Sequence, residues 1–269
     1  MYNFLKKGLL FIIAAILIVG TVSVPEMAYA EDAGAVIDKS EIKNGIIIVD
    51  YKNGTDSLVR ITKDSSKYLY ELSGEARVPL QLGNGDYKIE VLANIEGNKY
   101  RQVTAETVNY NGDNGKTVFL QSNEIVKWSS DMASIKKAKA LTKKASTDTE
   151  KVAAIYSYIV KNIKYDYEKA KTVQSGYVPA IDDVYTEKEG ICYDYAVLFA
   201  AMLRSVGVPA KVLMGTSTDV SEYHAWNQVY MKETKKWITI DTTIDAALKT
   251  AKADKMAKKA SHYMVEKQY

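Results

Sequence analysis

The sequence predicts an α+β protein in which an all-β half precedes a half that mixes helices and strands. Short β-branched runs separated by turns rich in Gly and Asn fill residues 36–120, at a spacing typical of a small β-sandwich. After Trp128 the apolar residues recur at three- and four-residue spacings, which indicates amphipathic helices. Two alternating segments at residues 223–230 and 237–241 then predict a sheet in the same half.

Composition and charge exclude several functional classes. Of the 269 residues 47% are hydrophobic and 26% are charged, which is ordinary for a globular protein. Lys and Arg number 36 against 33 Asp and Glu, and a net charge of +3 is too small to indicate a nucleic-acid partner. One Cys excludes an internal disulfide, and two His exclude a His-rich metal site. We therefore expect no metal and no cofactor.

The first thirty residues, 1–30, are predicted to be a secretory signal peptide. Two lysines precede an apolar run over residues 8–20, and the Ala-Tyr-Ala of residues 28–30 is a pattern that signal peptidase accepts. The alternative is an uncleaved membrane anchor, but the run is shorter than the ~20 apolar residues needed to span a bilayer. We expect cleavage after Ala30 and a secreted protein, extracellular or associated with the cell wall, that has no membrane contact once cleaved.

Residues 31–128 are assigned to the β-sandwich domain. The strands are predicted at residues 46–51, 59–62, 68–72, 78–82, 87–93, 100–108 and 117–120. Pro79 favours an edge position for the fourth strand, because proline cannot donate a hydrogen bond to a neighbouring strand. The Gly-Asn-Gly-Asp of residues 83–86 predicts a hairpin after it. This half has no His, no Cys and no clustered carboxylates, so no chemistry is expected there.

Residues 129–269 form the second predicted domain, which begins with two helices. The Ala- and Lys-rich stretch at residues 133–144 has high helix propensity. Thr147 and Glu150 form a capping-box pattern that opens the second helix, which is expected to end at residues 165–167. Its buried face is predicted to carry Val152, Ile155, Ile159 and Ile163. Residues 171–188 show no regular pattern.

The single cysteine lies at the predicted start of a third helix. Residues 192–204 are apolar nearly all round, which indicates a helix inside the domain. In the first turn, Cys192 would sit beside free backbone N–H groups and the positive end of the helix dipole. That position favours a thiolate and can hold an oxyanion, and Gly190 would give the chain a flexible approach to it. Composition alone leaves a reactive nucleophile and an inert core thiol equally open.

Two strands after this helix can bring a histidine next to an aspartate. If the turn is centred on residues 232–233, His224 lies directly opposite Asp241. If it is centred on residues 233–234, the two are diagonal neighbours on one face, whereas a register of the other parity would separate them. A carboxylate beside an imidazole fixes its tautomer, and an imidazole beside a thiol gives the ion pair that attacks amides.

Four motifs in this half resemble the transglutaminase-like superfamily, namely residues 189–196 (EGICYDYA), 203–210 (LRSVGVPA), 224–227 (HAWN) and 237–243 (WITIDTT). The order Cys, His, Asp and the spacings of 32 and 17 residues are similar to the family core. The resemblance covers about residues 151–243, with Thr242 standing where the family often has proline. The first half also resembles the β-sandwich of secreted bacterial members.

The resemblance implies a papain-like α+β catalytic domain and a role for each motif residue. Cys192 would be the nucleophile, His224 the base and Asp241 the residue that orients His224. Family members often take a second oxyanion donor from an aromatic or amide side chain upstream of the Cys, and Tyr165 is our candidate. Asn227 is the rival orienter, although its strand parity points it away from His224.

Two further residues have open interpretations. Trp226 either shields the His–Asp contact from water or is a plain core residue. His262 lies in a Lys-rich tail with no evident partner and is expected at the surface.

The leading interpretation is a secreted thiol enzyme that acts on amide bonds through an acyl-enzyme on Cys192. Its partners would be protein or peptide substrates, with cell-wall and surface proteins among the candidates. Whether an amine or water resolves the acyl-enzyme stays open, because fold membership does not name a substrate. The alternative is a non-catalytic adhesion or wall-associated module on the same fold. A complete set of Cys, His and Asp argues against it, and the absence of a short-spaced ligand pair argues against a metal site.

Overall fold

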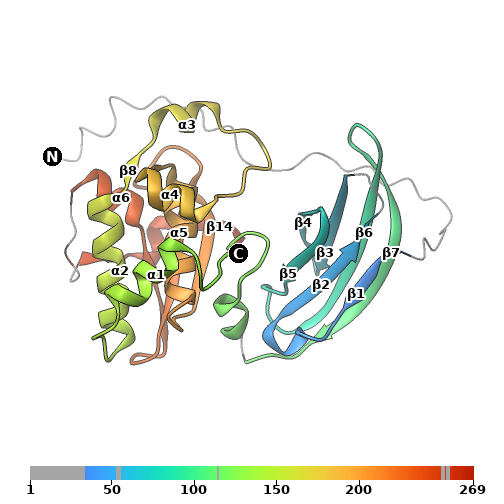
Figure 1. The fold of residues 1–269 in the computed structure, drawn as a ribbon, viewed down its shortest axis with the longest axis horizontal. Coiled ribbons are helices and arrows are strands. Elements are labelled where there is room, and N and C mark those ends of the chain that lie inside the picture. Colours follow the sequence, from blue (N-terminus) through green and yellow to red (C-terminus); the bar gives the residue numbers. More distant parts are fainter. Residues whose placement is uncertain (1–33, 53–55, 114, 250–251, 253–254) are drawn as a thin grey trace.

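The computed structural model describes residues 34–52, 56–113, 115–249, 252 and 255–269. The predicted signal peptide and its cleavage site lie outside these residues. Among the residues described, no helix is both long and apolar enough to cross a membrane. The chain is α+β, and its β-rich first half stands beside a mixed second half (Figure 1).

Two antiparallel sheets face each other in the first half. The smaller sheet has the order β1-β2-β5 and consists of β1 (Val36–Asp38), β2 (Ile46–Tyr51) and β5 (Gly74–Pro79). The larger has the order β4-β3-β6-β7 and consists of β3 (Ser57–Lys63), β4 (Ser66–Leu72), β6 (Gly85–Glu96) and β7 (Lys99–Tyr110). Alternate residues of the facing strands are buried together, for example Ile47, Val49, Ile61 and Ile89. This alternation is what a two-layer sandwich requires.

Two predictions for this half are wrong. The turn at residues 83–86 does not close a hairpin, because β5 ends at Pro79 and pairs with β2, while β6 lies in the other sheet. The Tyr87 hydroxyl closes this crossover, because it lies within hydrogen-bond distance of the carbonyl oxygens of Gly83 (2.6 Å) and Leu80 (3.0 Å). Residues Thr117–Leu120 form a 3₁₀ helix instead of a strand, because the Asp113 carboxylate caps their N-terminal N–H groups. Pro79 does lie in an edge strand, as predicted.

A five-stranded antiparallel sheet and one buried helix form the centre of the second half. The strand order is β13-β12-β11-β10-β14, with β10 (Ala210–Ser217), β11 (His224–Met231), β12 (Lys236–Ile240), β13 (Ala257–Lys258) and β14 (Tyr263–Gln268). Helix α5 (Cys192–Arg204) packs on β10 and β11, and all of its residues are buried, as its apolar sequence predicts.

Shorter elements surround α5 (Figure 1). The helices are α1 (Ala133–Leu141), α2 (Asp148–Asn162), α3 (Tyr167–Thr172), α4 (Ile181–Glu187) and α6 (Thr242–Ala247). Strand β8 (Lys164–Tyr165) pairs in parallel with β9 (Glu189–Gly190), directly before Cys192. The capping box of Thr147 and Glu150 is present at the start of α2, as predicted.

Several boundaries differ from the prediction. Helix α1 stops at Leu141 instead of residue 144, and α2 ends before β8. Residues 171–188, which show no regular pattern in sequence, contain α4. Strand β14 was also missing from the prediction, because its alignment comes from pairing with the distant β10.

The end of β14 joins the two halves. The Gln268 side chain donates to the carbonyl of Gln81 at 2.8 Å, and its backbone N–H donates to the Tyr68 hydroxyl at 3.2 Å. The rings of Tyr68 and Tyr269 meet edge to face at 5.4 Å. At the far end of α5, the Arg204 guanidinium donates to the carbonyl of Gln121 at 2.9 Å. The two halves are therefore linked by contacts at both the strand and the helix.

Candidate active site

Cys192 is the first residue of α5, and its side chain is only 5% exposed. The helix start is fixed by Asp194, whose carboxylate accepts a hydrogen bond from the Ile191 N–H at 2.8 Å. Gly190 makes this possible, since a Cβ at that position would lie 2.6 Å from the Cβ of Asp194. Gly190 therefore serves close packing in β9, and not the flexible approach expected from the sequence.

Asp194 is a buried acidic residue that sequence reasoning missed. It is 0% exposed, and its carboxylate accepts from the Tyr177 hydroxyl at 2.5 Å and pairs with the Lys169 ammonium at 2.8 Å. A carboxylate in the first turn also interacts favourably with the helix dipole. The sequence signal was its place three residues after the N-cap, which is the acidic position of a capping box. These contacts anchor the end of α5 that carries Cys192.

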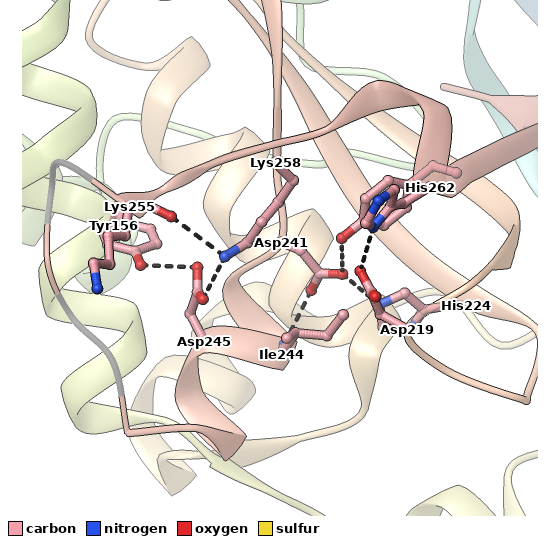
Figure 2. A network of polar contacts seen from close by, with 10 residues as sticks. Tyr156, Asp219, His224, Asp241, Ile244, Asp245, Lys255, Lys258 and His262 are labelled. Atoms are coloured by element: carbon pink, nitrogen blue, oxygen red, sulfur yellow. Dashed lines mark hydrogen bonds and ion pairs between the residues drawn. The ribbon is translucent and has the colours of Figure 1, made fainter. Parts of the chain in front are cut away.

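His224 and Asp241 are brought into contact by the β11–β12 hairpin. Asn227 pairs with Ile240 and Met231 with Lys236, which is the register of the turn centred on residues 233–234. His224 and Asp241 are therefore diagonal neighbours, with His224 Nε2 2.8 Å from Asp241 Oδ2 (Figure 2). Asp241 is also the N-cap of α6, because its Oδ1 accepts from the Ile244 N–H at 3.1 Å.

The environment of this pair favours its charged form. Burial alone would lower the pKa of His224, but Asp241 and the Cys192 side chain outweigh burial and raise it to about 10. Burial would raise the pKa of Asp241, but His224, the Ile244 N–H and the Tyr263 hydroxyl hold it below its usual range. The Cys192 side chain also interacts with the imidazole, and because Nε2 faces Asp241, Nδ1 is the ring nitrogen left to serve the thiol.

Two aromatic side chains lie beside the His–Asp contact. The Trp226 ring stacks on His224 at 6.2 Å and 21°, and its other neighbour is the Tyr263 ring at 4.9 Å. Tyr263 also donates a hydrogen bond from its hydroxyl to Asp241 Oδ2 at 3.1 Å. Nothing in the sequence around Tyr263 indicates this contact, because it depends on the long-range pairing of β14.

Tyr165 lies in β8, opposite Gly190 in β9, two residues before the thiol. Burial and then the charge on Cys192 raise the pKa of Tyr165, so its hydroxyl keeps its proton. The ring packs edge to face on Tyr167 at 5.0 Å. The structure thus places Tyr165 on the strand that pairs with the segment leading to Cys192.

Asn227 and His262 have other roles. The Asn227 amide donates to the carbonyls of Ala196 and Lys211, both at 2.9 Å, and so ties α5 to β10. The expectation that His262 lacks a partner is wrong, because its Nδ1 lies 3.2 Å from Asp219 Oδ2. A 3₁₀ turn at Ala260–His262 brings the ring over the loop after β10.

A small pocket, open to solvent on one side, lies beside the thiol and the imidazole. It is lined by Ile191, Cys192, Tyr193, Met214, Tyr223, His224 and Ala225. Apart from Cys192 and His224, its side chains are aliphatic, thioether or aromatic. Among the residues described there is no group of three or more His, Cys, Asp or Glu that could hold a metal ion. The arrangement can form a thiolate, transfer a proton through His224 and accept an apolar group.

Comparisons with known proteins place these residues in context. Residues 135–242 match the model of the transglutaminase-like superfamily. The Kyphoscoliosis peptidase of Mus musculus is 32% identical over 118 residues, which cover 40% of this chain and 17% of the peptidase. UPF0252 protein MJ1282 of Methanocaldococcus jannaschii is 32% identical over 120 residues, which cover 40% of this chain and 33% of that protein. A solved candidate cysteine protease of Cytophaga hutchinsonii gives a TM-score of 0.46 at 18% identity, over 82% of this chain and 73% of its own.

Proposed function

We propose that this chain is an exported thiol enzyme that acts on amide bonds, and the match of residues 135–242 to the transglutaminase-like superfamily supports this. Cys192 is the nucleophile, His224 the base and Asp241 the residue that orients His224. The observation that carries the proposal is the buried contact of His224 Nε2 with Asp241, which turns the other ring nitrogen toward Cys192.

The reaction proceeds through a thioester. The Cys192 thiolate attacks the amide carbonyl carbon, and the C–N bond breaks as the His224 imidazolium gives its proton to the leaving amine. Water or a second amine then attacks the thioester, His224 takes its proton, and the thiolate is released. Backbone N–H groups at the start of α5 and the Tyr165 hydroxyl stabilise the oxyanion in both steps.

The substrate is a protein or peptide. The apolar lining of the pocket supports an acyl donor with an apolar group near the reacting carbonyl. The name of the mouse relative, a peptidase, supports water as the acceptor in this chain. Export is supported by the predicted signal peptide, with the cell wall and surface proteins as candidate sources of substrate.

The test is intact-mass detection of the acyl-enzyme. The full chain is incubated with a peptide ester that carries an apolar side chain, with and without an added amine. We expect a mass increase equal to the acyl group in the wild type and none in Cys192→Ala or His224→Ala. Release as the free acid indicates hydrolysis, and release as the new amide indicates transfer. A wild type that forms no adduct with any peptide probe would favour a scaffold.

A further inference from the structure

Tyr263 lies outside the motifs that carry the Cys, His and Asp, yet its hydroxyl contacts the same oxygen as His224. It donates to Asp241 Oδ2 at 3.1 Å, and His224 Nε2 lies 2.8 Å from that atom. The Ile244 N–H donates to the other carboxylate oxygen, Asp241 Oδ1, at 3.1 Å. The Asp241 carboxylate is therefore held from three directions, by β14, by β11 and by the first turn of α6.

The position of Tyr263 follows from the way β14 approaches β10. The two strands are antiparallel, with Tyr263 opposite Ser217, and their register shifts at Met214 and Gly215. A Cβ on Gly215 would lie 2.0 Å from the carbonyl oxygen of Met264, so only glycine permits this approach. The Tyr263 ring is in turn packed against Trp226. The hydroxyl is thus directed by both backbone pairing and ring packing.

We propose that Tyr263 is a positioning residue, whose hydroxyl keeps Asp241 charged and directed at His224. The inference rests on the proposed function. Asp241 is fully buried and has lost its hydration, so its charge depends on the hydrogen bonds that it accepts. A neutral phenol supplies such a bond without a second positive charge that would compete with the imidazolium. Burial and Asp241 raise the pKa of Tyr263, so it remains a donor.

Other titratable groups also surround Asp241, and each has its own partner. His224 faces it from β11, with the Cys192 thiol of α5 beyond the imidazole. Asp245 lies one turn further along α6, where Lys258 and Tyr156 bind its carboxylate (Figure 2). Asp219 lies within electrostatic range of Tyr263 and bonds His262.

Asp245 supplies a matched control. Tyr156 donates to Asp245 at 2.8 Å, much as Tyr263 donates to Asp241. Tyr156→Phe and Tyr263→Phe therefore each remove one hydroxyl donor from a buried carboxylate. In the full chain we would measure the rate of Cys192 alkylation by iodoacetamide against pH. In Tyr263→Phe we expect the acid limb of this rate–pH profile to move up by about one to two pH units. In Tyr156→Phe we expect it to stay in place. An unmoved limb in Tyr263→Phe, or equal shifts in both variants, would overturn the proposal.

A second readout does not depend on thiol reactivity. The chain has two histidines, so nitrogen-15 NMR can follow the His224 ring, with His262→Gln assigning the other signal. We expect Tyr263→Phe to raise the pH at which the His224 signal senses protonation of Asp241, and an unchanged titration overturns the inference. If the wild type alkylates no faster than His224→Ala, the proposed function fails, and the titration still decides the role of Tyr263.

Discussion

The two halves of this chain bury charge in different ways. In the sandwich, the buried acid Glu90 is held by Arg60 from the neighbouring strand β3, with nitrogen–oxygen distances of 2.7 and 2.8 Å, and by Lys88. Among the described residues of the mixed half, four charged residues are at most 2% exposed, namely Asp194, Arg204, Asp241 and Asp245. Each of them is bound by partners from at least two other segments.

This difference concerns the free energy that each half loses when a charged side chain is buried. A buried ion loses several kcal/mol of hydration, which its partners offset only if the geometry is good. In the sandwich, one side-chain cluster on the sheet meets that need. In the mixed half, two of these buried acids lie beside the candidate site, Asp194 near Cys192 and Asp241 in contact with His224. The buried acids therefore mark the candidate site more clearly than the pocket does.

Asp241 and Asp245 sharpen the comparison within one short helix. Each accepts a tyrosine hydroxyl and faces a basic group, His224 in one case and Lys258 in the other. The pKa of Asp241 is nevertheless lowered, whereas burial raises the pKa of Asp245 despite Lys258 and Tyr156. The surroundings of Asp241 therefore favour its charged form, whereas the partners of Asp245 do not fully offset the effect of burial on its pKa.

The largest expected effect is that of Asp241→Asn. An amide can still accept a hydrogen bond, but it can favour the wrong tautomer of His224 and removes the charge that stabilises the imidazolium. The corresponding change in serine-protease triads lowers turnover by ~10⁴, and we expect a loss of that order in the rate of acyl-enzyme formation. Adduct yield by intact mass and the thermal midpoint are measured on the same sample, so that the loss of adduct can be compared with the loss of stability that follows from removing this ion pair.

Asp245→Asn is the control for this prediction. It makes the same chemical change one turn away, where the carboxylate binds Lys258 and not His224. We expect acyl-enzyme formation to stay within a few-fold of the wild type. Full adduct yield in Asp241→Asn, or an equal loss in both variants, would remove Asp241 from the mechanism.

The second prediction concerns pH and the stability of the fold. The pKa of His224 rises from 6.5 to about 10 on folding, so its charge stabilises the fold fully below pH 6.5. That contribution is lost as the pH rises through 10. Asp241 sets the lower pH limit. Because folding lowers its pKa from 3.8, its charge stabilises the fold above pH 3.8, and this contribution is lost as the pH falls through the pKa of the folded state.

His224→Gln isolates this contribution, because glutamine can donate to Asp241 but carries no charge. By urea unfolding we expect the free energy of unfolding of His224→Gln to lie about 3–5 kcal/mol below that of the wild type near pH 6. This deficit should narrow as the pH approaches 10. His262→Gln, which alters the half-exposed pair with Asp219, should show no such narrowing. A deficit in His224→Gln that is constant over this range would show that the imidazole is neutral throughout.

Much of this site could be predicted because its signals are local. The capping box at Thr147 and the helix start at Cys192 follow from residues close in sequence, and the hairpin sequence permits, without fixing, the register that joins His224 to Asp241. The contacts of Tyr263 and of Lys169 with the buried acids could not be predicted. They depend on β14 pairing with β10 and on α3 folding back over the start of α5, and neither leaves a periodic pattern in the sequence.

The smallest expected effects come from replacing one glycine in each half. Gly190→Ala would place a Cβ 2.6 Å from that of Asp194, so β9 or the first turn of α5 must shift. Gly97, in the β6–β7 hairpin, has a φ of +53° and nothing within 4 Å of an added Cβ. We expect Gly190→Ala to cost about 1–3 kcal/mol through overpacking, and Gly97→Ala to cost about 1 kcal/mol through backbone strain alone.

Thiol reactivity distinguishes these two losses. The shift in Gly190→Ala displaces Cys192 relative to His224, so alkylation by iodoacetamide should slow well beyond what the loss of stability explains. Gly97→Ala leaves the second half untouched and should alkylate at the wild-type rate, although its unfolding midpoint in urea is lower. If Gly190→Ala alkylates normally while losing stability, the packing of Gly190 on Asp194 supports the fold without positioning the thiol. Of the two buried acids beside the candidate site, Asp241 would then serve the chemistry and Asp194 only the helix.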